Sequence, residues 1–217
     1  MTTADRPLAV LGIETSGRSG GVALLLGAVL VAEESLAAGL YHGRNLVPAL
    51  RCLLDSAGVE PARLDLIAVT RGPGSHTGLR IGLMAAMTIA QTLARPAVGI
   101  DTLEALCFQA PAGAPAIVAA LAARQDRLFA GIRAGTRWIA EPALRTAAEV
   151  AALTPAGAVL TGSGAAALEP MLEHRPDVTL TPPADREVRA ASVARLGARH
   201  SERAGPPAEL HALYFPR

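Results

Sequence analysis

The sequence contains no lysine: its 20 basic residues are all arginine, against 19 acidic residues. This absence excludes mechanisms that need a lysine amine, including Schiff-base chemistry and the phosphate-binding lysine of a P-loop. The formal net charge of +1 gives no general electrostatic case for binding nucleic acid or a membrane surface. Aromatic residues make up only 3% of the chain, whereas 51% of residues are hydrophobic. A core of alanine, leucine and valine is therefore expected, which favours packed α/β layers.

Cysteines, paired histidines and long apolar runs are also scarce. Cys52 and Cys107 lie in apolar contexts and lack the CxxC spacing of a metal or redox site, so we interpret both as reduced, buried thiols. None of the five histidines lies four residues from another, so the helical pair that would hold one metal ion is missing. We interpret His42 as a capping or surface residue. Because no apolar segment is long enough to span a bilayer and no leader pattern opens the sequence, a cytoplasmic chain is expected.

Hydrophobic periodicity predicts the order β-β-β-α-β-α twice along the chain. Strands are expected at residues 8–14, 21–26, 29–36, 64–70, 116–122, 127–134, 137–142 and 158–161. Helices are expected at residues 45–57, 78–94, 146–153, 165–174 and 190–203. The repetition predicts an α/β fold of two ribonuclease-H-like lobes. Their expected bounds are residues 1–107 and 108–217, with the final helix and tail packing back on the N-terminal lobe.

The stretch VTRGPGSHTGLRIG, residues 69–82, places a glycine-rich loop between an expected strand and an expected helix. It departs from the P-loop pattern, because Leu79 and Arg80 stand where Lys and Ser or Thr are needed. It also lacks the GxSxG pattern of a nucleophile elbow. We interpret it as a tight turn in which Thr77 caps the helix. The alternative is a phosphate or nucleotide site that the loop forms with the turn after the first strand, through Glu14, Thr15, Ser16, Gly72, Gly74, Ser75, Thr77 and Arg80.

The helix expected after this loop carries no charged residue from position 81 to 94. A helix that covers one face of a sheet normally presents charged residues to water. The helix expected at residues 45–57 also has a wide apolar stripe, and two such neighbours leave an apolar patch unless something covers it. This pattern favours a protein partner over the alternative that the C-terminal lobe covers the helices. The predicted interface residues are Leu46, Val47, Leu50, Leu53, Leu54, Ile81, Met84, Ala85 and Thr88.

Four motifs resemble the TsaB family: LGIETS at 11–16, RGPGSHTGLRIG at 71–82, GIDTLEAL at 99–106 and LYFPR at 213–217. The resemblance spans nearly the whole chain and implies the actin-like duplication of sugar kinases. It implies a non-catalytic subunit that supports TsaD, the transferase that places threonylcarbamoyl on transfer RNA adenosine beside the anticodon. It also implies TsaE in the same complex and a homodimer in isolation through the same helices. Transfer RNA, and ATP or ADP with magnesium, are implied only at the level of the complex.

The chain departs from the family pattern at several positions. His76 stands where the family has Phe, and Glu14 stands where it has Asp. The segment LAARQDRLFAG, residues 121–131, keeps Arg124 of the family's strand motif. Ala122 and Arg127 replace acids in that motif, so the polar network of those acids is not carried over to this chain.

Two other functions stand as alternatives. An independent nucleotide-hydrolysing enzyme would use Glu14, Thr15, Ser16 and the loop at residues 72–78 around magnesium. A transfer-RNA-binding module would rely on arginines, but no basic cluster is interleaved with aromatic residues. The TGSGAAA segment, residues 161–167, reads as GxGxxA but lies too late for an N-terminal dinucleotide-binding unit. Without a metal-binding histidine pair, a peptidase is not expected.

Overall fold

The computed structural model describes residues 6–36 and 42–214 of the 217-residue chain. The last three residues of the LYFPR motif lie outside these ranges. The chain forms two compact units, one of residues 1–101 with 189–212 and one of residues 102–188 with 213–217. None of the helices in the described ranges combines the length and apolar character of a membrane span.

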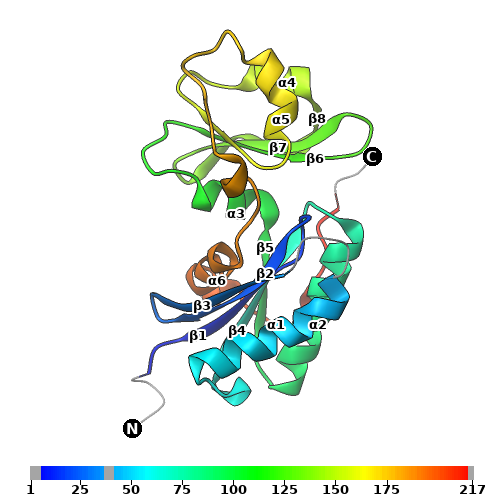
Figure 1. Ribbon diagram of the computed structural model, residues 1–217, viewed down its shortest axis with the longest axis vertical. Coiled ribbons are helices and arrows are strands. Elements are labelled where there is room, and N and C mark those ends of the chain that lie inside the picture. The colour runs from blue at the N-terminus through cyan, green and yellow to red at the C-terminus, as the bar shows by residue number, and fades with distance from the viewer. Residues whose placement is uncertain (1–5, 37–41, 215–217) are drawn as a thin grey trace. The chain divides into compact units, whose positions relative to one another are not determined.

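The first unit contains a five-stranded mixed sheet (Figure 1). Its strands are β1 (Ala9–Glu14), β2 (Gly20–Leu26), β3 (Val29–Leu36), β4 (Leu66–Gly72) and β5 (Ala97–Asp101). They are ordered β3-β2-β1-β4-β5, with β1, β2 and β3 antiparallel and with β4 and β5 parallel to β1. Gly27 turns the chain from β2 to β3 with φ +60°, a conformation that glycine adopts without a steric penalty.

Helices cover both faces of this sheet (Figure 1). Helices α1 (His42–Ala57) and α2 (His76–Thr92) lie on one face, and α6 (Ala190–Arg199) lies on the other against β1, β2 and β4. Helix α6 approaches β1 closely because residue 12 is glycine. A Cβ atom at Gly12 would lie 2.6 Å from the carbonyl oxygen of Ala190.

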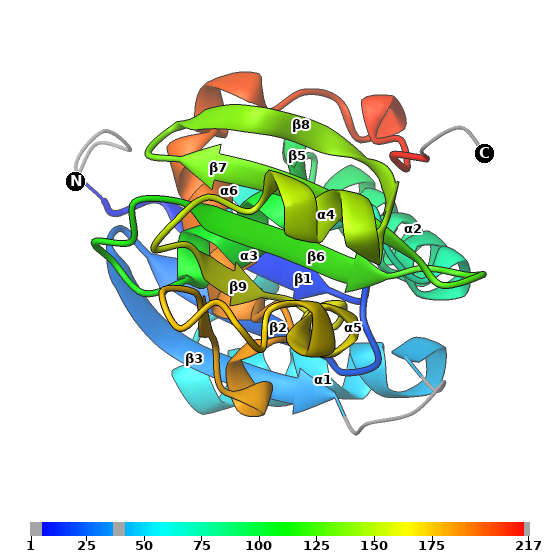
Figure 2. The same cartoon turned by 90° about the horizontal axis from the view of Figure 1, so that it is seen from above.

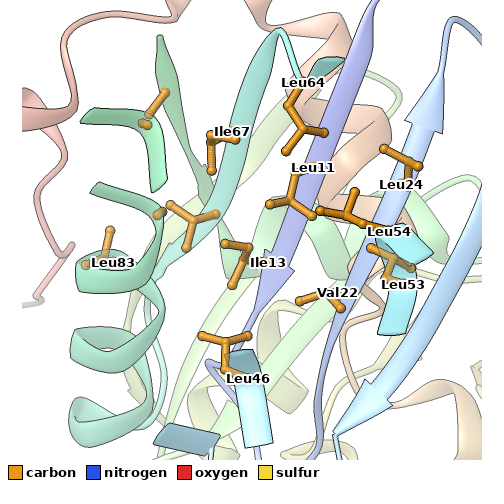
Figure 3. Close-up of a cluster of buried hydrophobic side chains, with 14 of the residues drawn as sticks. Leu11, Ile13, Val22, Leu24, Leu46, Leu53, Leu54, Leu64, Ile67 and Leu83 are labelled. Carbon is orange, nitrogen blue, oxygen red and sulfur yellow. The ribbon is translucent and has the colours of Figure 1, made fainter. Parts of the chain in front are cut away.

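The core of the first unit lies between the sheet and helices α1 and α2 (Figure 3). Leucine, isoleucine and valine side chains fill it, and removing each from water contributes about 1.5–3 kcal/mol. Its labelled members in Figure 3 are Leu11, Ile13, Val22, Leu24, Leu46, Leu53, Leu54, Leu64, Ile67 and Leu83.

The second unit contains another five-stranded sheet, with helices α4 and α5 over one of its faces (Figure 2). Its strands are β6 (Ile117–Ala122), β7 (Arg127–Ala134), β8 (Arg137–Thr146), β9 (Val159–Thr161) and β10 (Thr179–Leu180). Its helices are α3 (Thr102–Gln109), α4 (Ala147–Leu153) and α5 (Ala165–Leu168). Thr146 and Glu149 form a capping box at the start of α4, which satisfies backbone donors that the helix cannot bond itself.

Both sheets have the same topology, and the predicted duplication of a ribonuclease-H-like unit is confirmed. The second sheet is ordered β10-β9-β6-β7-β8, so each sheet has its own first strand at the centre, antiparallel to the second and parallel to the fourth. The helix after the last strand of each sheet belongs to the other unit. Helix α3 follows β5 but lies in the second unit, and α6 follows β10 but lies in the first.

Several element bounds differ from the prediction. Strand β8 continues through Pro142 to Thr146, because it is an edge strand and its pairing with β7 is irregular between Ala130 and Ile132. The helix expected to reach residue 174 ends at Leu168, since Pro170 lacks the backbone donor that would continue it. The final helix ends at Arg199 and is followed by a short 3-10 turn. The fifth strand of each sheet, β5 in the first unit and the two-residue β10 in the second, was not predicted.

Candidate functional site

Helices α1 and α2 expose apolar side chains on neighbouring faces. Val47 of α1 is 66% exposed, and Met84 of α2 is 60% exposed. The first turn of α1 lies close to the second turn of α2, since a Cβ atom at Gly43 would lie 3.6 Å from Cδ1 of Ile81. The α1–α2 surface, as we name it, consists of the half-buried or exposed residues Val47, Leu50, Ile81, Met84, Ala85 and Thr88.

Three residues of the predicted interface do not belong to this surface, and the prediction is corrected for them. Leu46, Leu53 and Leu54 are at most 5% exposed and point from α1 into the core (Figure 3). Their spacing of seven and eight residues places them on one stripe of the helix, and that stripe faces the sheet. Sequence periodicity reveals a wide apolar band, but only the packing shows which part of the band the sheet covers.

The outer face of α2 exposes few groups that need a polar partner. The Thr88 hydroxyl donates to the Met84 carbonyl oxygen at 2.8 Å, and the Thr92 hydroxyl donates to the Thr88 carbonyl oxygen at 2.8 Å. Both hydroxyls are therefore satisfied within the helix and leave their methyl groups on the surface. No charged residue lies between Ile81 and Thr92. Because the threonine hydroxyls bond within the helix, the outer face of α2 presents a mostly apolar surface.

A groove continues the α1–α2 surface along α1. It has a volume of about 590 Å³ and shares Val47 and Leu50 with that surface. Charged groups at its edge include Arg51 and Asp55, whose side chains form an ion pair at 3.6 Å. The residues that line the groove are Val47, Leu50, Arg51, Leu54, Asp55, Gly58, Val59, Glu60 and Pro61.

The glycine-rich loop packs directly on the turn that follows β1. The Ser75 backbone N–H donates to the Ser16 carbonyl oxygen at 2.7 Å, and the Thr15 hydroxyl donates to the Gly78 carbonyl oxygen at 2.9 Å. A Cβ atom at Gly74 would lie 2.5 Å from the Ser16 carbonyl oxygen, and one at Gly78 would overlap the Thr15 carbonyl oxygen. These glycines are therefore required for close packing, which agrees with the interpretation of the loop as a tight turn.

The residue that caps α2 is Ser75, so the prediction of Thr77 as the cap is wrong. The Ser75 side chain accepts a hydrogen bond from the Gly78 backbone N–H at 3.2 Å. Serine and threonine both favour this position, and a sequence with Ser75 and Thr77 two residues apart does not choose between them. The contact of Ser75 with the β1 turn decides the choice, and Thr77 is exposed, as is Arg80.

Glu14 lies at the centre of the buried polar groups near this loop. Its Oε1 atom accepts hydrogen bonds from the Ser16 backbone N–H and hydroxyl, both at 2.5 Å, whereas Oε2 is buried without a hydrogen-bond partner among the described residues. Burial raises the pKa of Glu14 to about 7, and the Ser16 hydrogen bonds oppose this shift. Burial therefore keeps this carboxyl group protonated to a higher pH than an exposed glutamate.

His42 occupies the first described turn of α1 and is 5% exposed, so its interpretation as a surface residue is corrected. Its Nε2 atom lies 3.2 Å from the Gly17 carbonyl oxygen. Because a carbonyl oxygen only accepts, Nε2 is the donor in this contact. The sequence carries no signal for this role, since Gly17 and His42 are 25 residues apart.

The candidate nucleotide contacts divide into two groups. Gly74, Thr77 and Arg80 are exposed and Ser75 is half-buried, whereas Gly72 belongs to the buried group. Glu14, Thr15 and Ser16 are buried, and their side chains are engaged in hydrogen bonds of the protein itself. A magnesium ion needs oxygen ligands and keeps several of its waters, which Glu14 at 1% exposed does not accommodate. In the described ranges, no three His, Cys, Asp or Glu side chains gather as metal ligands would.

In the second unit, the positions that depart from the family motif are bonded locally. The Ala122 backbone N–H donates to the Ser163 hydroxyl at 3.2 Å. The Arg127 guanidinium donates to the Leu144 carbonyl oxygen at 3.0 Å across the β7–β8 pair. Arg124 is exposed in the turn between β6 and β7. Arg127 thus joins two strands, which is a structural role.

Comparison with known protein families gives a match over most of the chain. The family model described as TsaD, tRNA N6-adenosine threonylcarbamoyltransferase, matches residues 36–195. A curated protein of Bacillus subtilis (strain 168), named tRNA threonylcarbamoyladenosine biosynthesis protein TsaB, is 36% identical over 99 residues. The matched region spans 46% of this chain and 43% of the relative, which is less than half of the relative's length.

Solved structures resemble the chain over nearly its full length. YeaZ from Pseudomonas aeruginosa has a TM-score of 0.79 and 27% sequence identity, covering 96% of this chain and 100% of that one. A ROK hexokinase from Thermus thermophilus has a TM-score of 0.50 and 13% identity, covering 89% of this chain and 100% of that one. At this identity the hexokinase shows only a shared fold, that of the actin-like duplication.

Proposed function

Because the chain belongs to the TsaB family, within the wider group that the TsaD model describes, we propose that it works in threonylcarbamoyladenosine synthesis on transfer RNA. Its role is that of a non-catalytic subunit that binds and supports a TsaD-type threonylcarbamoyltransferase. The modified adenosine is the one next to the anticodon. Transfer RNA meets this chain only through the assembled complex.

The α1–α2 surface supports this proposal most directly. Val47 and Met84 leave most of their apolar surface in water, and covering each would contribute about 1 kcal/mol. The threonines of α2 bond within the helix, so a partner covering them leaves no buried hydroxyl unsatisfied. A second polypeptide with an apolar helical face fits this chemistry.

The proposal has three further parts. The same surface pairs two copies of this chain when TsaD is absent, TsaE joins the complex, and ATP or ADP with magnesium acts at the level of the complex. The hydrolase alternative is not proposed, because the Thr15 hydroxyl donates to the Gly78 carbonyl oxygen and the Ser16 hydroxyl donates to Glu14.

The substitution Met84→Glu tests the proposed surface. A carboxylate at this exposed position stays solvated in the free chain, so the free energy of unfolding should change by no more than about 0.5 kcal/mol. On pairing, it loses water without gaining a partner charge, which costs several kcal/mol. We expect binding to TsaD of the same organism to weaken at least about 100-fold in a calorimetric titration.

Met171→Glu is the matched control, because Met171 is also exposed, at 51%, but lies in the second unit. This control should bind TsaD as tightly as the unsubstituted chain. Undiminished binding by the Met84→Glu chain would show that the partner uses another surface. Equal losses in both variants would point to a general effect of added negative charge.

A further inference from the structure

The turn that follows β1 is bonded to the first turns of both helices that form the α1–α2 surface. Thr15 and Ser16 reach α2 through the hydrogen bonds to Gly78 and from Ser75, at 2.9 and 2.7 Å. Gly17 reaches α1 through its carbonyl oxygen, which lies 3.2 Å from Nε2 of His42. Three consecutive residues thus connect two helices that begin 34 positions apart in the sequence.

This turn has little freedom to move by itself. Thr15 and Ser16 are at most 4% exposed, and Glu14 holds Ser16 by both its backbone N–H and its hydroxyl. On the α2 side, glycine at 74 and 78 brings the loop into direct contact with the turn. On the α1 side, a Cβ atom at Gly20 would lie 3.1 Å from Cε1 of His42. Displacement of the turn would therefore displace both helix starts.

The two helices otherwise rest on different parts of the sheet. Helix α1 packs mainly on β2 and β3, whereas α2 packs mainly on β4. Their direct contact is small and includes Gly43 and Ile81 near their first turns. The β1 turn is therefore a hydrogen-bonded link between the two helix starts, in addition to the core that the helices share on the sheet.

We propose that residues 15–17 form a positioning element that fixes the separation of α1 and α2 and so sets the affinity of the α1–α2 surface for its partner. This inference rests on the proposed function, because it concerns the same surface. A partner that covers Val47 on one helix and Met84 on the other must match one separation. Loosening the turn broadens the range of distances between α1 and α2, and fewer molecules then have the distance that the partner requires.

The substitution Thr15→Val tests the element, since valine keeps the shape of threonine but removes the hydrogen bond to Gly78. Thr154→Val is the matched control, because the buried Thr154 hydroxyl likewise donates to a helical carbonyl, that of Val150, at 2.8 Å in the second unit. Both variants lose the same kind of bond. We expect only Thr15→Val to weaken TsaD binding, by about tenfold. Wild-type affinity in both variants, or equal losses, would overturn the proposal.

A second measurement needs no partner. Cys107 is buried as expected, whereas Cys52 on α1 is exposed, which corrects its interpretation as a buried thiol. A spin label on Cys52 and one on Gln91→Cys of α2 therefore report the separation of the helices. Dilution with unlabelled chain removes distances between molecules. We expect a broader or shifted distance distribution in the Thr15→Val chain and an unchanged one in the Thr154→Val chain.

The two measurements separate the failure of each proposal. If the unsubstituted chain does not bind TsaD, the proposed function is wrong, and the distance distributions still test the positioning element. If the chain binds TsaD but Thr15→Val leaves the distances unchanged, the positioning element is wrong and the proposed function stands.

Discussion

Among single residues, Glu14 is an acidic side chain that the fold removes almost completely from water. It is 1% exposed, and one of its carboxylate oxygens has no hydrogen-bond partner among the described residues. Burial disfavours the charged form and raises its pKa to about 7, above the ordinary value of 4.5. In the unfolded chain the carboxyl group loses its proton near pH 4.5. Between pH 4.5 and about 7, the folded state therefore retains a proton that the unfolded state has lost.

This difference predicts how stability depends on pH. Below pH 4.5 both states are protonated and Glu14 has no effect. As pH rises to about 7, the contribution of Glu14 to the free energy of unfolding falls by about 3 kcal/mol in total, because the folded state binds more protons than the unfolded state. Glu14→Gln keeps an oxygen for Ser16 but does not titrate. We therefore expect the variant to gain about 3 kcal/mol relative to the unsubstituted chain between pH 4.5 and pH 8, in urea unfolding.

The comparison at two pH values serves as its own control, because any pH-independent effect of the glutamine amide on the free energy of unfolding cancels. Parallel pH profiles for the two proteins would mean that Glu14 is ionised with its ordinary pKa in the folded state. Sequence alone does not reveal this shift. Glutamate at the end of a strand is exposed in many proteins, and only the packing around Glu14 removes its water.

At the scale of elements, α2 combines two tasks. Its inner face contributes Leu83, Ala86 and Ala90 to the core, and its outer face forms part of the α1–α2 surface. The sequence indicated both tasks, because a stretch without charge implies burial on more than one side. It assigned part of α1 wrongly, since the leucines at 46, 53 and 54 cover the sheet.

A conservative change on α2 checks that its threonines need nothing from a partner. In Thr88→Val the lost hydroxyl had bonded the Met84 carbonyl, which keeps its backbone hydrogen bond in the helix. We expect a change in unfolding free energy within about 0.5 kcal/mol and unchanged or tighter TsaD binding. Thr88→Asp, which adds a charge at the same position, should weaken binding in the same titration. A large loss with valine would instead mean that the hydroxyl bonds the partner.

At the scale of the whole molecule, the helix that follows the last strand of each sheet belongs to the other unit. Helix α6 covers one face of the first unit's sheet, although residues 102–188 of the second unit precede it in the chain. A truncation before α6 would therefore expose the face of the first sheet that carries Gly12 and Gly21, both of which approach Ala190. This arrangement leaves α1 and α2 on the opposite face of that sheet.

The proposed role of the α1–α2 surface predicts the state of assembly. We expect the isolated chain to elute as a dimer in size-exclusion chromatography with light scattering. Added TsaD should convert it to a heterodimer, because both partners compete for the α1–α2 surface. The Met84→Glu chain should elute as a monomer. A complex that retains two copies of this chain together with TsaD would show that the two contacts use different surfaces.

The sequence by itself determined the first four strands of each sheet, the uncharged stretch of α2 and the glycine-rich loop, because these depend on local periodicity and local backbone freedom. The tertiary structure decided which α1 leucines face the sheet, that Ser75 rather than Thr77 caps α2, and that His42 contacts Gly17. Those features depend on groups that are far apart in the chain and meet only after the sheet has formed. Residue type and spacing constrain each of two contacting residues separately, and only packing brings the two residues within hydrogen-bond distance.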